Sequence, residues 1–112
     1  MEDSQSDIST ISITLRNGKY KAEAVLYWYA DDTSTVYLSN LKVAKEIRQQ
    51  GFGKYLMTLQ EKITYILRAN TICLWVRKGS WLHDWYKSLG YKKFNKHYKK
   101  GFIWMSKDII RF

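Results

Sequence analysis

One junction near the middle of the chain constrains the fold more than any other feature of the sequence. Up to residue 43, apolar and polar residues alternate as in half-buried strands, and from residue 54 the apolar residues recur at helical spacing. The segment between is polar and ends in Gly51 and Gly53, which allow backbone conformations that are closed to other residues. A glycine loop that leads directly into a helix presents several free N–H groups at the positive end of the helix dipole, and such a site binds phosphate.

Three strands are predicted before this junction. Residues 8–15 alternate between apolar and polar, and Asn17-Gly18 is typical of a two-residue hairpin turn. Residues 19–29 are rich in aromatic and β-branched side chains and predict a second strand. A turn at residues 30–33 and a third strand over residues 35–43 complete an antiparallel unit.

After the junction, helices and strands alternate. A helix is predicted over residues 54–67, a fully buried strand over residues 71–76, and short strands over residues 91–94 and 100–107. Ser80 can cap a second helix that ends at Gly90. The resulting order, β-β-β-α-β-α-β-β, predicts a mixed α+β fold in which helices pack on a mostly antiparallel sheet. The apolar stripes of the two helices are predicted to be Leu56, Leu59, Ile63, Ile66 and Leu67, and Trp81, Leu82, Trp85, Tyr86 and Leu89.

Length and composition predict a single domain. The 112 residues contain no linker-like tract and no repeat, so we expect a flexible acidic tail at residues 1–7 and one domain over residues 8–112. No apolar run is long enough for a transmembrane helix, and the acidic N-terminus lacks the pattern of a secretory signal. Cys73 is the only cysteine, and no His/Cys/Asp cluster has metal-ligand spacing. These features predict a cytoplasmic protein with no metal, no disulfide and no membrane partner.

Charge is distributed unevenly along the chain, whose net charge is +9. Residues 1–32 carry three basic and six acidic side chains, whereas residues 33–112 carry sixteen basic and four acidic ones. Such a surface predicts an anionic partner: a phosphorylated cofactor, an acidic protein or a nucleic acid. Residues 92–100 contain five lysines interleaved with aromatics, which we interpret as a solvated or protein-docking turn rather than a nucleic-acid site. Exposed edge strands leave a homodimer open.

The glycine loop does not match two well-known phosphate-binding motifs. A P-loop requires Ser or Thr after Gly-Lys, and here Gly53-Lys54 is followed by Tyr55. A dinucleotide-binding loop requires a third glycine at the position that Leu56 occupies. Neither motif therefore accounts for the loop.

The loop instead resembles the acetyl-CoA signature of the GNAT superfamily of N-acetyltransferases. In that signature an Arg or Gln is followed after two residues by a Gly and after one more by a Gly or Ala. Arg48, Gly51 and Gly53 fill these positions, and Val43 ends the preceding strand. The second family segment, a helix with an aromatic-Tyr pair and a Leu-Gly-aromatic ending, is similar to residues 82–91, LHDWYKSLGY. The resemblance extends over about residues 35–95.

The resemblance implies that acetyl-CoA is the co-substrate and that its acetyl group passes directly to an amine. Tyr86 would be the general acid that protonates the leaving thiolate, and a backbone N–H near Leu41 or Lys42 would stabilise the oxyanion. Strand residues would pair with the pantetheine arm, and loop N–H groups would hold the pyrophosphate. The implied cofactor-binding residues are Leu41, Lys42, Val43, Arg48, Gln49, Gln50, Gly51, Phe52, Gly53 and Lys54.

Three departures from the family pattern affect the expected chemistry. Gly79 stands where the family often has an asparagine, and residues 38–40 lack the carboxylate that often serves as the base. Asn17-Gly18 directly joins two strands that are usually separated by a pair of helices, which shape the acceptor pocket. The acceptor site would then be open, which suits a lysine of a protein better than a buried small amine. A non-catalytic acyl-CoA-binding module and a basic nucleic-acid-binding domain remain alternatives.

Overall fold

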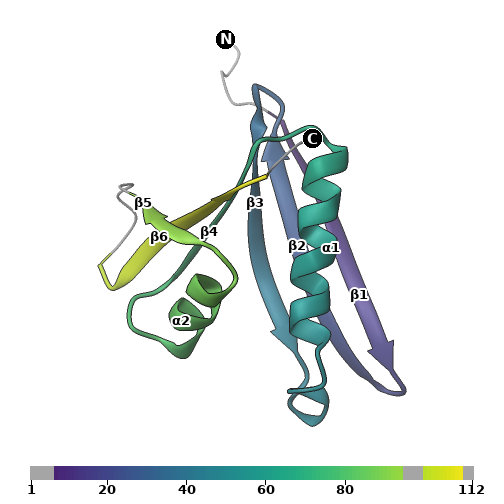
Figure 1. The fold of residues 1–112 in the computed structure, drawn as a ribbon. Coiled ribbons are helices and arrows are strands. Elements are labelled where there is room, and N and C mark those ends of the chain that lie inside the picture. The colour runs from purple at the N-terminus through teal and green to yellow at the C-terminus, as the bar shows by residue number, and fades with distance from the viewer. Residues whose placement is uncertain (1–6, 95–99, 110–112) are drawn as a thin grey trace.

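The computed structural model describes residues 7–94 and 100–109 and contains the predicted succession of elements (Figure 1). The sheet comprises β1 (Ile8–Asn17), β2 (Tyr20–Tyr29), β3 (Asp32–Val43), β4 (Thr71–Arg77), β5 (Lys92–Phe94) and β6 (Phe102–Asp108). A short 3-10 helix, η1 (Lys45–Ile47), and α1 (Phe52–Ile66) connect β3 to β4, and α2 (Trp81–Ser88) follows β4. The prediction of a mixed α+β fold with a mostly antiparallel sheet is therefore confirmed.

The sheet opens between its two halves. The strand order is β1-β2-β3-β4-β6-β5, and only the central pair, β3 and β4, is parallel. This pairing extends from Thr35 opposite Thr71 to Tyr37 opposite Cys73 and then stops. Beyond it, β3 continues along β2 to Val43, while β4 continues along β6. Figure 1 shows β3 and β4 diverging from this point.

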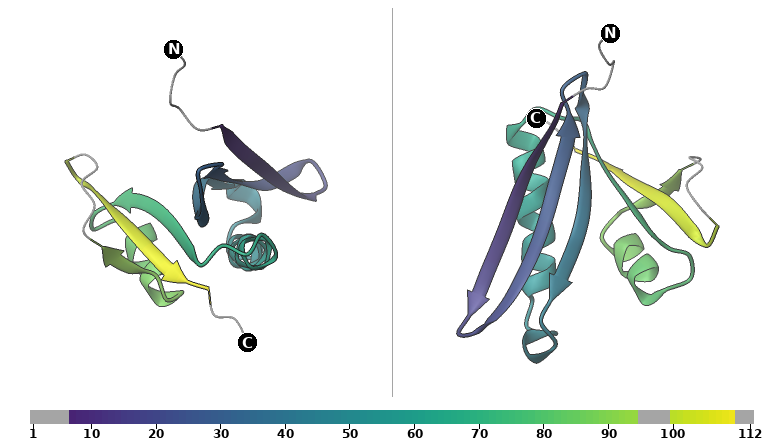
Figure 2. Two further views of the ribbon diagram at one scale, coloured as in Figure 1. Left: turned by 90° about the horizontal axis from the view of Figure 1, so that it is seen from above. Right: turned by 180° about the vertical axis from the view of Figure 1, so that it is seen from behind.

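Both helices pack on the same face of the sheet. Strand residues such as Leu26, Val36 and Ile72 form one core with Met57 of α1 and Tyr86 of α2. Successive strand residues point to opposite faces, so the residues between them lie on the other side. Among the described residues no helix covers that side, and the right-hand view of Figure 2 shows β1, β2 and β3 in front of α1. We call it the helix-free face.

A second core cluster anchors the loop before α1. Ala22 and Ala24 of β2 are fully buried, and their small side chains leave room for Ile47 and Leu56. Burial of Ile47 fixes η1 against β2. The glycine loop that follows therefore starts from a rigid position.

The predicted apolar faces are partly wrong. Ile66 is 76% exposed, whereas Gln60 and Thr64 are buried on α1. The Thr64 hydroxyl donates to the Gln60 carbonyl at 2.8 Å, so it needs no partner outside the helix. Trp81 is 71% exposed at the start of α2, and Trp75 is 38% exposed in β4, which the sequence predicts to be fully buried. The spacing of apolar residues identifies the helices and strands. It does not show how far a neighbouring element extends, and therefore which apolar side chains that element covers.

Some predicted features fall outside the described residues. These are the tail up to residue 6 and residues 95–99 of the lysine-rich segment. Asp7 is described, and its carbonyl accepts a hydrogen bond from the Ala30 N–H at 2.9 Å. None of the described helices is long and apolar enough to cross a membrane.

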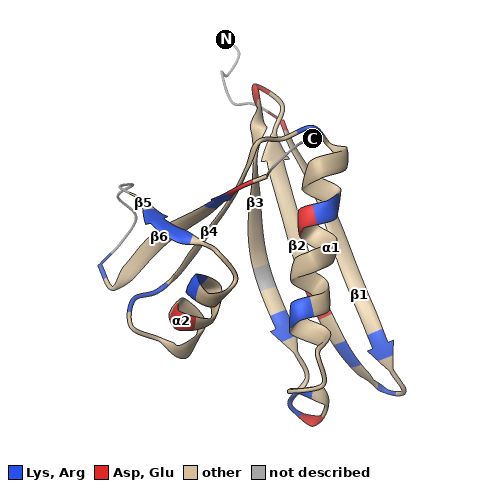
Figure 3. Ribbon diagram, viewed as in Figure 1, with Lys and Arg blue, Asp and Glu red and all other residues tan. Residues whose placement is uncertain are grey.

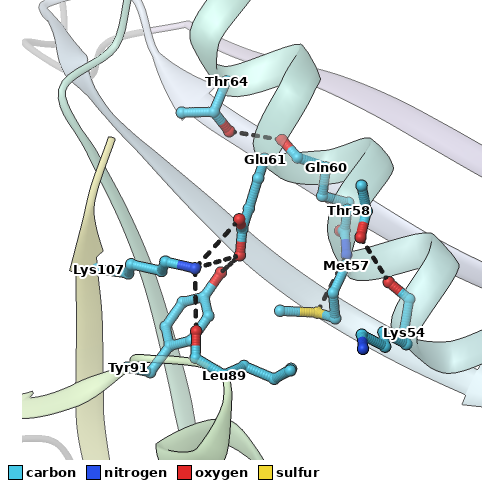
Figure 4. Close-up of polar contacts among 9 residues, drawn as sticks. All are labelled: Lys54, Met57, Thr58, Gln60, Glu61, Thr64, Leu89, Tyr91 and Lys107. Carbon is cyan, nitrogen blue, oxygen red and sulfur yellow. Dashed lines mark hydrogen bonds and ion pairs between the residues drawn. The ribbon is translucent and has the colours of Figure 1, made fainter. Parts of the chain in front are cut away.

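A hydrogen-bonded cluster ties α1 to the second half of the sheet (Figure 4). Glu61 of α1 accepts hydrogen bonds from the Tyr91 hydroxyl at 3.0 Å and from the Lys107 ammonium at 3.2 and 3.3 Å. The same ammonium donates to the Leu89 carbonyl at 2.9 Å, just after α2. We call Glu61, Tyr91, Lys107 and Leu89 the Glu61 clasp. It spans the two halves of the molecule beside the point where β3 and β4 separate.

We expect Glu61→Ala to lower the free energy of unfolding by about 2 kcal/mol, because Lys107 and Tyr91 lose their half-buried acceptor. Urea denaturation followed by tryptophan fluorescence measures the change. The matched control is Lys21→Ala, which breaks an exposed ion pair with an N–O distance of 3.7 Å to Glu23 and should cost less than about 0.5 kcal/mol. Equal losses in the two variants would contradict the role of the clasp.

Candidate functional site

A cleft of about 430 Å³ occupies the opening between β3 and β4. It exists because the two strands stop pairing after Tyr37 and Cys73, which leaves two strand edges facing each other without a strand between them. An extended ligand can pair with such an edge as an added strand does. The lining residues are Leu38, Ser39, Leu41, Lys42, Leu74, Trp75, Val76, Arg77, Ser80, Leu82, Tyr86 and Phe102.

β3 contains a β-bulge where it borders the cleft. The register passes from Ser39 opposite Val25 to Lys42 opposite Glu23, so β3 has two residues where β2 has one. A bulge removes a residue from the ladder and changes the direction of its backbone groups. The N–H groups near Leu41 and Lys42, which the resemblance implies as oxyanion donors, lie at this bulge. Their position at an interrupted ladder is one that the sequence did not reveal.

The glycine loop leaves a row of backbone N–H groups unpaired. Within the described chain, no group accepts a hydrogen bond from the N–H groups from Gln49 to Lys54. Gln49 and Gly51 have positive φ angles of 65° and 88°, and left-handed residues of this kind build anion-binding concavities from successive N–H groups. A Cβ on Gly51 would meet no atom within 4 Å. Conformation, and not packing, therefore requires a glycine at this position.

The N-terminus of α1 lacks the protein partners that α2 has. The Ser80 hydroxyl caps α2 by accepting from the His83 N–H at 3.3 Å, and Asp84 lies in the first turn. α1 starts after Gly51 with no side-chain cap and no acidic residue in its first turn, where Lys54 stands instead. Such a start is unfavourable on its own and becomes favourable when an anion binds.

Arg48 differs from the other predicted loop residues. Its N–H donates to the Lys45 carbonyl at 3.3 Å, and its Nε donates to the Val43 carbonyl at 3.0 Å. The side chain therefore folds back over the end of β3 and braces the loop, and the unpaired N–H groups begin at Gln49. Figure 3 shows further Lys and Arg residues at the end of β3 and in the first turn of α1.

Gly53 brings the first turn of α1 against α2 and β3. A Cβ at this position would lie 3.6 Å from the Trp85 ring and 3.9 Å from the Val43 side chain. The preceding residue, Phe52, is half-buried against the Ile47 cluster. The predicted loop residues are thus brought together with the end of β3, beside the helix that carries Tyr86.

Tyr86 lines the cleft and is 7% exposed. Its ring centroid lies 5.3 Å from that of Trp85 and 5.9 Å from that of Tyr91. Burial raises the pKa of the Tyr86 hydroxyl from 10.0 to about 12, so the hydroxyl stays protonated at neutral pH. No described residue forms a hydrogen bond with this hydroxyl. It can therefore donate its proton to a ligand in the cleft.

The sequence analysis missed the β4 and β6 side of the cleft. Trp75 and Phe102 contact each other with ring centroids 5.0 Å apart, and the Arg77 guanidinium lies 5.1 Å from the Phe102 ring. Strand alternation places Trp75 and Arg77 on one face, but it does not indicate that β3 has left β4 at this point.

Among the described residues, the cleft lining contains no carboxylate or imidazole that could act as a base. None of the lining residues is Asp, Glu or His, in keeping with the lack of a carboxylate in residues 38–40. The His83 Nδ1 accepts a hydrogen bond from the Gly79 N–H at 3.1 Å and thereby braces the loop before α2. In the part of the chain that the structure describes, no His, Cys, Asp and Glu residues are grouped so that they could hold a metal ion.

Comparison with known proteins places this site in a family. The model of the acetyltransferase (GNAT) domain matches residues 7–93. Comparison with curated proteins found no match. The ribosomal-protein-S18-alanine N-acetyltransferase of Escherichia coli is 22% identical over 92% of this chain and 71% of its own, with a TM-score of 0.74.

Two further solved structures have the same fold. An aminoglycoside 6'-N-acetyltransferase complexed with coenzyme A is 18% identical over 92% of this chain and 74% of its own, with a TM-score of 0.72. An acetyltransferase from Bacillus cereus is 18% identical over 93% and 76%, with a TM-score of 0.69. Such identities indicate a shared fold only. Because the family model spans most of the chain, however, this protein belongs to the GNAT family of acetyltransferases.

Proposed function

We propose that this GNAT domain transfers the acetyl group of acetyl-CoA directly to an amine, a lysine side chain of a protein acceptor. The observation that carries the proposal is the row of unpaired N–H groups from Gln49 to Lys54. This row adjoins the end of β3, whose free edge borders a cleft that also contains Tyr86. The site thus offers, in spatial order, N–H groups for a diphosphate, a strand edge and a proton donor. These suit the pyrophosphate, the amide-bearing arm and the thioester of one ligand.

The cofactor would be held mainly by backbone groups. Acetyl-CoA would supply an acetyl group on a thioester, whose carbonyl carbon is open to attack by an amine. The N–H groups of residues 49–54 would bind the pyrophosphate, assisted by the charges of Lys45 and Lys54. Residues 41–43 of β3 would pair with the amides of the pantetheine arm.

The chemical step needs few side chains. A backbone N–H near Leu41 or Lys42 would donate to the carbonyl oxygen as negative charge develops there. The Tyr86 hydroxyl would give its proton to the sulfur as the carbon–sulfur bond breaks and the carbon–nitrogen bond forms. Because the cleft lining has no Asp, Glu or His, the proton of the amine would leave to water, and Tyr86 would regain its proton from water.

The open acceptor end of the site favours a protein over a small amine as the acceptor. β1 and β2 are joined by the short turn after Asn17, and no described helix lies between them. The cleft consequently has no additional wall on the helix-free face. A lysine on the surface of a partner can reach such an open site, whereas a small amine would be enclosed on few sides.

A non-catalytic acyl-CoA-binding module is the second candidate, because the cleft lining offers no general base. The two functions differ in one outcome. With radiolabelled acetyl-CoA and a mixture of candidate proteins, the enzyme produces a labelled protein. The binding module retains the labelled cofactor and produces none.

We expect Gly51→Leu to abolish acetyl-CoA binding, measured by isothermal titration calorimetry. A leucine strains the left-handed backbone and covers the N–H groups that would receive the pyrophosphate. Gly18→Leu is the matched control, because Gly18 also has a positive φ, of 64°, and open space around its Cβ position. Both variants should lose similar stability, but Gly18→Leu should retain affinity. Unchanged affinity in Gly51→Leu would refute the assignment of the loop.

Tyr86→Phe should reduce kcat by roughly a hundredfold to ten-thousandfold, the usual contribution of a general acid. The dissociation constant of acetyl-CoA should stay within about twofold, since the ring and its packing are retained. Stopped-flow measurement of the transfer step, together with calorimetry, separates the two effects. If turnover were unchanged, Tyr86 would be a core residue and not the acid.

The pH profile should also be unusual. With no base in the cleft, kcat/KM should rise with pH as the acceptor amine loses its proton. Since burial raises the pKa of Tyr86 to about 12, no descending limb from loss of the acid should appear below pH 10. Initial rates with a constant peptide acceptor between pH 6 and about 10 test this. A bell-shaped profile with a maximum near neutrality would indicate a base that the cleft lining does not contain.

A further inference from the structure

Residues from both faces of the sheet line the cleft, and we call its side beside the helices the first mouth and its side on the helix-free face the second mouth. The glycine loop and α2 lie at the first mouth, because both helices pack on the same face of the sheet. Side chains of Trp75, Arg77 and Lys42 belong to the second, since their strand neighbours Val76 and Val43 point toward the helices. Phe102 pairs with Arg77 across β4 and β6, so it lies on the same side. If the cofactor fills the first mouth, the second remains for the acceptor.

The two charged residues at the second mouth are both basic. Arg77 is exposed and lies on the β4 side, and Lys42 is exposed and lies on the β3 side, so a cation stands on each side of the opening. The carboxylate nearest in the strand register is Glu23, opposite Lys42. Glu23 already pairs with Lys21 and does not line the cleft. Among the described residues that line the cleft, an incoming amine therefore meets positive charge and no carboxylate.

Aromatic rings form the floor beside these charges. Trp75 packs edge-on against Phe102, and the Arg77 guanidinium lies over the Phe102 ring. Farther along the same face, Tyr27 and Tyr37 are stacked on each other, with centroids 5.2 Å apart and planes inclined by 14°. Rings that stack on each other are less suited to stack on nucleic-acid bases, which need exposed ring faces. This arrangement favours a peptide over a single-stranded nucleic acid.

We propose that the acceptor amine enters from the helix-free face and is flanked by carboxylates that pair with Arg77 and Lys42, so that the acceptor is an acidic segment of a protein. This inference rests on the proposed acetyl transfer and narrows its acceptor. Charges placed on both sides of an opening mainly set specificity, because they attract one sign of charge and repel the other. A basic segment would bring further positive charge between Arg77 and Lys42.

The same charges favour the reactive form of the amine. A lysine ammonium beside two cations is destabilised relative to the neutral amine, and only the neutral amine attacks a thioester. Carboxylates on the flanking residues of the acceptor would neutralise Arg77 and Lys42 only in part, at the rim, while the amine lies deeper. Selection of an acidic segment and generation of the free amine thus arise from one arrangement.

The test compares two N-terminally blocked peptides, each with a single central lysine, flanked in one by glutamates and in the other by arginines. Binding to the protein loaded with coenzyme A is measured by calorimetry, and transfer is measured separately by mass spectrometry with acetyl-CoA. We expect the acidic peptide to bind at least about tenfold more tightly at low salt and the difference to shrink at high salt. Arg77→Glu should remove most of this preference and leave the affinity for acetyl-CoA within about twofold.

Lys62→Glu is the matched control, since it makes the same change in net charge at an exposed position of α1 that does not line the cleft. It should leave the preference intact. Equal binding of the two peptides, or an equal effect of Arg77→Glu and Lys62→Glu, would overturn the inference. So would loss of acetyl-CoA binding in Arg77→Glu, or displacement of the acidic peptide by a single-stranded oligonucleotide that binds more tightly. Preferential binding of the acidic peptide without transfer would support this surface and refute only the proposed chemistry.

Discussion

The parallel pairing of β3 with β4 is the constraint on which the rest of the structure depends. It joins the two halves of the sheet over the stretch from Thr35 to Tyr37 only, and both strands extend well beyond it. Backbone N–H and C=O groups must find partners or face solvent. The edges of β3 and β4 beyond this pairing therefore face water or can form hydrogen bonds with a bound ligand. The cleft follows from this early end of the ladder, and the bulge of β3 against β2 lies in one of its walls.

Because β3 and β4 pair over a short stretch only, other contacts must help to hold the two halves of the sheet together. The Glu61 clasp supplies such contacts on the helix side, where it bonds α1 to β6 and to the end of α2. The half-buried carboxylate and ammonium are each satisfied by more than one partner, which is the condition under which such groups contribute to stability. Within the clasp, Tyr91 also packs its ring against that of Tyr86. The same contacts that hold the halves together therefore fix the position of the proposed acid.

The two helix termini illustrate a division between stability and binding. α2 is capped by Ser80 and has an acidic first turn, so its N-terminus is complete without a ligand. α1 has neither, and the loop residue Gln49, which is not a glycine, adopts a left-handed conformation that costs stability. Burial of Ile47 and the bonds from Arg48 to the ends of neighbouring segments compensate for this cost. An uncapped, rigidly anchored helix start is what a phosphate-binding site requires.

The sequence by itself determined the features that depend on local chemistry. Alternation gave the three early strands, glycine spacing gave the loop, and Ser80 and Gly90 set the limits of α2, because each of these depends on the φ/ψ preferences and periodicity of adjacent residues. Tyr86 was proposed as a site residue because it lies in a short segment that resembles one of the family, and the structure places it in the cleft lining.

Only the tertiary structure decided which surfaces those elements share. The end of the β3–β4 pairing, the exposure of Ile66 and Trp75, and the meeting of Glu61 with Lys107 depend on contacts between residues far apart in the chain. Local patterns do not encode such contacts, because the same strand or helix can pack to different lengths against different neighbours. For the same reason Arg77 and Lys42 became recognisable as the two sides of one opening only when the strands that carry them were seen to part.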